Sequence, residues 1–271
     1  MIPTKSYTLQ NETRQYLRRL YAYGKELNPT DVADIDNFIK GLKQLGLWQD
    51  SVSWLLRSRH NVGSGTTALS LGGQATNLTN GTLINGPTWS NDGIQFTRSL
   101  STYIQTQPLQ LLPRSVFCWA IFYSTTTAST EQFIIQQGDN NNIPYPGWWL
   151  QLLSNNFTFA YSDQQLSTLA YRNIPYNGVN RWSYGSGTRS GTFNQIAYEN
   201  TIINGTSTNI GIGYITPTRR VTIGNSLATT ARGFDGRILA CGFVTSSMNA
   251  NTSTLMKSLL RTTIGKTIPF N

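Results

Sequence analysis

Two nine-residue segments constrain the fold most, because most of their positions are apolar. They are SVFCWAIFY at residues 115–123 and GRILACGFV at residues 236–244. A strand with one face in water alternates apolar and polar residues, whereas a strand covered on both faces is a nearly continuous apolar run. The two segments therefore predict central strands of a sheet that is covered on both faces.

Shorter strand-like segments lie between these two. The segment from Phe157 to Tyr161 alternates aromatic residues with Thr158 and Ala160, and turns rich in Asn, Ser and Gly separate the segments. Many short strands joined by polar turns are typical of a β-sandwich or barrel. We therefore predict a mainly β protein, with further strands at residues 132–137, 148–153, 157–161, 194–199 and 220–223.

The first sixty residues differ, because their apolar residues recur at helical spacing. The clearest helix starts at Thr30, which can cap it, carries Asp31 and Asp34 in its first turn, and ends at Gly46. Helices are predicted at residues 12–23, 30–45 and 48–57. The composition then becomes rich in Gly, Ser and Thr. We divide the chain into an N-terminal helical attachment module (1–60), a linker or loop with the first strand (61–84), and a β-sandwich (85–271).

The apolar stripes of these helices need a surface that covers them. They can pack on one another, on the sandwich or on a partner protein. If a partner covers them, we expect it to contact the large apolar residues of the stripes: Leu17, Tyr21, Phe38, Leu42 and Trp48.

Five pieces of the chain occur in the order found in one fold family. They are Gly93–Phe96, the segment 115–123, Gly147–Leu150, Arg220–Gly224 and Gly233–Ile238. Together they resemble the concanavalin A-like, or laminin G-like, jelly roll over roughly residues 85–265. The resemblance implies a concanavalin A-like jelly-roll β-sandwich behind the helical module.

The N-terminal segment resembles a smaller group of proteins than the sandwich does. Tyr23-Gly24, the run from Asp36 to Lys43, and Gly46-Leu47-Trp48 are similar to the helical leaders that tailed-phage virion proteins carry ahead of this sandwich. The resemblance implies a virion structural protein, either a capsid decoration or a tail-associated component. It would be made in the host cytoplasm and located in the virion. Other virion proteins and further copies of this chain are its expected partners.

The acidic residues after residue 60 are few and widely spaced: Asp92, Glu131, Asp139, Asp163, Glu199 and Asp235. Glycoside hydrolysis, which the same fold supports in glucanases, requires two carboxylates about 5–10 Å apart. No two of these acids lie within four residues of each other, so we predict a non-enzymatic protein. A hydrolase is the least favoured alternative. It stays open because two carboxylates can still meet across strands.

Metal ligands are also scarce in the sequence. His60 is the only histidine, and a zinc site needs a cluster of Cys and His residues, so we interpret His60 as structural. The segment 138–142 offers calcium one carboxylate, that of Asp139, beside amide oxygens. We favour a plain turn there and predict no cofactor, with calcium as the one metal left open.

Sugar binding is the main functional alternative, because sugars stack on aromatic rings and hydrogen-bond to amides and hydroxyls. The candidate residues are Asn140, Asn142, Tyr145, Trp148 and Trp149, with Trp182 and Tyr184 near a second turn-rich stretch. Neighbouring residues of a strand point to opposite faces, so at least one of Trp148 and Trp149 belongs to the core. This alternative is an adhesin for cell-surface glycans.

The net charge of +9 is spread along the chain without a long basic run, so we predict no nucleic-acid partner. We expect no membrane partner either, because no stretch approaches the roughly 18 apolar residues of a membrane span. The two cysteines, Cys118 and Cys241, lie in the two apolar runs. They are interpreted as buried free thiols, with a disulfide as the alternative.

Overall fold

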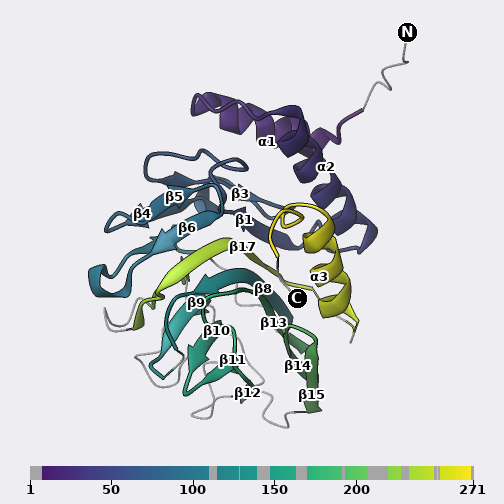
Figure 1. The fold of residues 1–271 in the computed structure, drawn as a ribbon. Coiled ribbons are helices and arrows are strands. Elements are labelled where there is room, and N and C mark those ends of the chain that lie inside the picture. The colour runs from purple at the N-terminus through teal and green to yellow at the C-terminus, as the bar shows by residue number, and fades with distance from the viewer. Residues whose placement is uncertain are drawn as a thin grey trace.

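The computed structural model describes residues 8–109, 115–127, 129–138, 147–162, 170–190, 193–206, 219–226, 232–246, 249 and 251–269. Two antiparallel sheets stack face to face, and helices cover the outer side of one of them (Figure 1). This arrangement is a jelly-roll β-sandwich with a small helical part, which confirms the predicted fold class.

The two sheets are built from strands that are distant in the sequence. Sheet A contains, in spatial order, β15 (Thr201–Thr206), β14 (Phe193–Tyr198), β13 (Trp182–Ser190), β8 (Ser115–Ser124), β17 (Gly236–Val244), β1 (Ser51–Leu55) and β3 (Ser70–Leu71). In the same sheet β6 (Gly93–Phe96) also pairs with β17, and β5 (Thr88–Ser90) pairs with β6. Sheet B contains β12 (Ala170–Pro175), β11 (Asn156–Ser162), β10 (Gly147–Leu153), β9 (Gln132–Gly138), β16 (Val221–Ile223), β7 (Tyr103–Gln105), β4 (Gly81–Ile84) and β2 (Thr67–Ala68).

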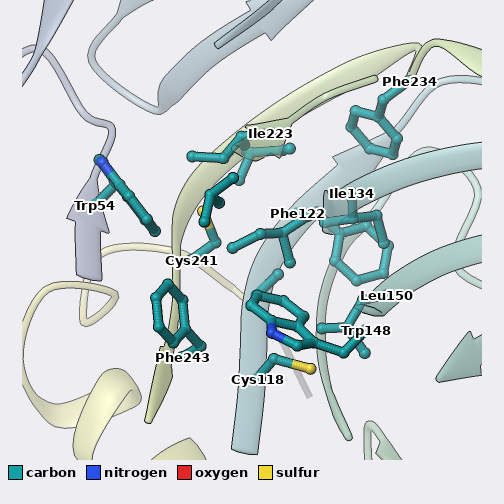
Figure 2. Close-up of a cluster of buried hydrophobic side chains, with 14 of the residues drawn as sticks. Trp54, Cys118, Phe122, Ile134, Trp148, Leu150, Ile223, Phe234, Cys241 and Phe243 are labelled. Atoms are coloured by element: carbon teal, nitrogen blue, oxygen red, sulfur yellow. The ribbon is translucent and has the colours of Figure 1, made fainter. Parts of the chain in front are cut away.

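The two continuous apolar runs are β8 and β17, and they pair with each other at the centre of sheet A. One face of each strand looks into the sandwich, where Cys118, Phe122, Cys241 and Phe243 meet Trp148 from sheet B (Figure 2). Their other face packs under the helices. Both faces are therefore covered, as the runs predict.

Three α-helices are described: α1 (Asn11–Ala22), α2 (Pro29–Gln44) and α3 (Thr252–Thr262). The cap of α2 is Asn28 and not Thr30, since the Asn28 side chain accepts a hydrogen bond from the Asp31 amide at 2.9 Å. The Phe38 ring of α2 lies edge-on to Trp119 of β8, with 6.1 Å between ring centroids. This contact fixes the helices to the outer side of sheet A. No described helix is long and apolar enough to cross a membrane.

The predicted helix at residues 48–57 is wrong. The middle of this segment forms β1 (Ser51–Leu55), which pairs with β17 on one side and β3 on the other. The spacing of Val52, Leu55 and Leu56 fits a helix, but a strand covered on both faces has the same composition. Val52 and Trp54 face the sandwich core, and Leu55 faces the helices. The sheets thus include residues before position 61, and the separation of residues 1–60 as an attachment module stays a prediction.

The two cysteines are free and buried, in accord with the first interpretation. Burial raises the pKa of both thiols well above the usual value, so both stay protonated. They behave as small apolar side chains that fill the core between the sheets.

Candidate functional site

The two adjacent tryptophans of β10 point to opposite faces of sheet B. Trp148 is fully buried between the sheets, where its ring lies 5.1 Å from that of Phe243 and its indole N–H donates to Gln137 at 3.3 Å. The prediction that Trp148 contacts a glycan is therefore corrected, because this ring is part of the core (Figure 2).

Trp149 lies on the other side, the outer face of sheet B. It packs against Phe133 of β9, with 6.3 Å between ring centroids, and against Ala160 of β11. A register shift in the β9–β10 pairing sets Gln151 opposite Phe133. The two rings and the Gln151 amide are thus placed on one surface.

One residue from each neighbouring strand continues this surface. Trp149 pairs with Gln136, Gln136 with Thr222, Thr222 with Gln105, and Gln105 with Thr82. Residues paired across an antiparallel sheet lie side by side on the same face. We call Trp149, Gln136, Thr222, Gln105 and Thr82 the outer row of sheet B.

Several polar atoms on this face are buried without a hydrogen-bond partner in the described part of the chain. They are both amide atoms of Gln136, Oε1 of Gln151 and Oγ1 of Thr222. An unpaired buried polar group costs about 1–3 kcal/mol, so native proteins usually pair such groups with protein, water or ligand. The outer row thus holds unpaired, buried donors and acceptors, and the neighbouring rings of Trp149 and Phe133 are themselves 4% and 0% exposed.

The row is buried from Trp149 to Thr222, and its exposure increases from there toward β4. Trp149 is 4% exposed and Thr222 is fully buried, whereas Gln105 is half-buried and Thr82 is exposed. Adjacent strands are about 4.8 Å apart, so the four steps from Trp149 to Thr82 span about 19 Å. The row therefore leads from solvent at β4 to the buried aromatic end at β10.

The other glycan candidates do not join this face. The ring centroids of Trp182 and Tyr123 are 5.6 Å apart, and the Arg237 guanidinium lies 5.4 Å from the centroid of the Trp182 ring. The Tyr184 hydroxyl donates to the Ser253 carbonyl at 3.1 Å beneath α3, and burial raises the pKa of this phenol. Both residues serve the packing of sheet A. Asn140, Asn142, Tyr145 and the calcium candidate Asp139 lie outside the described residues.

The expected docking residues separate into two groups. Phe38 and Leu42 are fully buried under α2, and Trp48 is 6% exposed, so these three are covered by the chain itself and the docking prediction is corrected for them. Leu17 and Tyr21 of α1 instead line a groove of about 480 Å³. Tyr21 is 68% exposed and is available to a partner.

No protein-family model and no curated protein matches this sequence. Solved structures match it by shape. Trypanosoma rangeli sialidase in complex with sialic acid has a TM-score of 0.58 at 10% identity, over 79% of this chain and 33% of the sialidase. The binding domain of botulinum neurotoxin serotype D has a TM-score of 0.52 at 9% identity, over 80% of this chain and 52% of that domain. The receptor-binding domain of the mosaic serotype C/D neurotoxin has a TM-score of 0.52 at 12% identity, over 78% of this chain and 51% of that domain.

This chain therefore spans a third to a half of the length of these proteins. At identities near 10%, the likeness shows the fold alone, which is a lectin-like jelly-roll sandwich.

The comparison corrects one prediction. The spacing of the carboxylates predicts a non-enzymatic protein, yet a sialidase, which is an enzyme, is among the structures with this fold. The prediction gives most weight to carboxylates that are close in the sequence and leaves pairs across strands as the open alternative, and the sandwich does bring distant strands side by side. Sequence spacing is thus no argument against catalysis here, and the prediction is withdrawn.

Proposed function

We propose that this protein binds carbohydrate through the outer row of sheet B. The observation that carries the proposal is the set of buried, unpaired polar atoms of Gln136, Gln151 and Thr222 beside the Trp149 and Phe133 rings. The lectin-like fold supports it, as does the sialic acid complex of a sialidase of the same fold.

The chemistry of the row suits a sugar. A sugar ring has an apolar C–H face that packs on an aromatic ring, and its hydroxyls both donate and accept hydrogen bonds. The Gln136 amide offers donors and an acceptor to such hydroxyls, and Thr222 offers a hydroxyl. Among the described residues, the outer row carries no charged side chain. Hydroxyl groups, and not a carboxylate, are thus the expected determinants of binding there.

The length of the row indicates more than one sugar unit. We propose that an oligosaccharide enters from the exposed end at Thr82 and places one ring against Trp149, about 19 Å away. Shortening the glycan should then reduce affinity stepwise.

The test is a glycan array with the full chain, including sialylated and neutral oligosaccharides, followed by calorimetry on the best ligand. Gln136→Met keeps the shape of the side chain and removes its unpaired amide. We expect at least tenfold weaker binding with unchanged or higher stability, because the buried amide is no longer left unpaired. Gln44→Met, at an exposed position of α2, is the matched control. Binding that Gln136→Met leaves unchanged would exclude the outer row.

A second candidate is a virion structural protein that attaches through its helices, as the N-terminal segment suggests. The groove of Leu17 and Tyr21 favours it, because an exposed apolar groove on a small helical part fits docking to a protein. The matched structures give this role no support. Its test is the detection of the chain in purified phage particles, and Tyr21→Ser should then abolish incorporation. The expected homo-oligomer is checked by light scattering of the purified chain.

A further inference from the structure

A second polar cluster lies where the start of α2 meets the turn that follows β1. Asp31 and Asp34 are one helical turn apart on α2, and His60 comes from that turn. One candidate ligand atom from each residue lies within 4.8 Å of the other two. The exposed fractions of Asp31, Asp34 and His60 are 2%, 3% and 0%, so the cluster is buried.

The His60 ring faces the two carboxylates without bonding to them. Its Nε2 atom lies 3.7 Å from Asp31 Oδ1 and 3.9 Å from Asp34 Oδ2, beyond hydrogen-bond distance. Within the described chain, neither ring nitrogen has a hydrogen-bond partner. A buried imidazole without a partner is costly, and a bound group between the ring and the carboxylates would remove that cost.

The two distances from His60 to the carboxylates are close to those around a small divalent ion. Zinc binds imidazole nitrogen and carboxylate oxygen at about 2.0–2.2 Å in tetrahedral geometry, which separates ligand atoms by about 3.3–3.5 Å. The two distances from His60 exceed this separation by a few tenths of an ångström. All three ligand atoms lie within 4.8 Å of one another, so the aspartate side chains would have to turn toward the ion.

Two cations now compensate the carboxylates. Arg59 pairs with Oδ1 of Asp31, the oxygen nearest His60, and the Asn28 amide donates to Oδ2 of Asp31 at 2.7 Å. Lys266 pairs with Oδ1 of Asp34, which leaves Oδ2 of Asp34 toward His60. Lys266 is the more exposed of the two, with 39% of its side chain accessible against 27% for Arg59. An incoming cation would therefore displace Lys266 more easily and take over its charge.

We propose that Asp31, Asp34 and His60 form a binding site for a divalent cation of the zinc class, with water as a further ligand. Such an ion would fasten the start of α2 to the turn after β1, and so hold the helical part on sheet A. The site shares no residue with the outer row of sheet B, so it stands independently of sugar binding.

The test uses the full chain after treatment with a chelator and dialysis. Zn²⁺ binding is measured by calorimetry, and Co²⁺ absorption reports the coordination geometry. We expect one Zn²⁺ per chain, a higher melting temperature with Zn²⁺, and at least tenfold weaker binding for His60→Gln. Lys266→Ala should bind at least threefold more tightly, because it removes the competing cation. Glu26→Gln, at an exposed position, should match the wild type.

Two results would overturn the site. A wild-type chain that binds no Zn²⁺ at millimolar concentration would show that Asp31, Asp34 and His60 do not form a zinc site. Equal affinity in wild type and His60→Gln would place the ion elsewhere on the protein. If His60→Gln fails to fold, Lys266→Ala decides, since unchanged or weaker affinity in that variant contradicts the proposal.

Discussion

The two faces of sheet B use the same strands in different ways. On the inner face, Trp148, Leu150 and Leu152 are buried in an apolar core, and the Trp148 indole has its hydrogen bond. On the outer face, Trp149 stands beside amides and a hydroxyl whose polar atoms are buried and unpaired. The inner face contributes mainly to stability. The inner face also holds one unpaired buried atom, Nε2 of Gln137, but the outer face gathers four such atoms on Gln136, Gln151 and Thr222, and this concentration motivates the binding proposal.

The largest expected effect comes from the inner face. Trp148→Ala should reduce the free energy of unfolding by about 3–5 kcal/mol, because it leaves a cavity between the sheets. Urea unfolding measures this loss. A cost below about 1 kcal/mol would contradict the assignment of Trp148 to the core.

On the outer face, Trp149→Ala should affect function more than stability. The ring packs on Phe133 and Ala160 alone within its cluster, so we expect a loss of stability at least about 1 kcal/mol smaller than for Trp148→Ala. Glycan affinity should fall at least tenfold, because the stacking surface is removed. Equal costs in urea unfolding for the two variants would break the contrast between the faces.

A smaller effect distinguishes an unpaired hydroxyl of the outer row from a hydrogen-bonded hydroxyl of sheet A. Thr222→Val removes an unpaired hydroxyl of the outer row, so stability should be unchanged or slightly higher. Thr188→Val is the matched control, because the Thr188 hydroxyl donates to the Val116 carbonyl at 3.0 Å and its loss should cost about 1 kcal/mol. Thermal unfolding of both variants checks the sign. A larger cost for Thr222→Val would mean that its hydroxyl is already satisfied.

Much of the sandwich could be predicted because its signals are local. The unbroken apolar runs identify β8 and β17, and the alternation in residues 157–161 identifies β11. The segment 48–57 could not be assigned in this way. Its apolar spacing fits a helix as well as a strand with two buried faces, and only the pairing with β17 and β3 decides.

The candidate site was less predictable for a physical reason. Trp149 was a candidate from its residue type alone. Gln136 and Thr222 join it from strands that are distant in the sequence. The register shift within the β9–β10 pairing also hides the period-two alternation of β9, so no local pattern marks Phe133 or Gln136 as outer-face residues.

Nuclear magnetic resonance of the glutamine side-chain amides tests the central claim most directly. The full chain is labelled with ¹⁵N and titrated with the glycan selected on the array. We expect the Gln136 and Gln151 amide signals to shift with the same affinity that calorimetry reports, while the signal of Gln132 stays in place because its amide already donates to Thr126 and Thr127. Saturation of the protein with glycan while the Gln136 and Gln151 signals do not move would contradict binding at the outer face of sheet B.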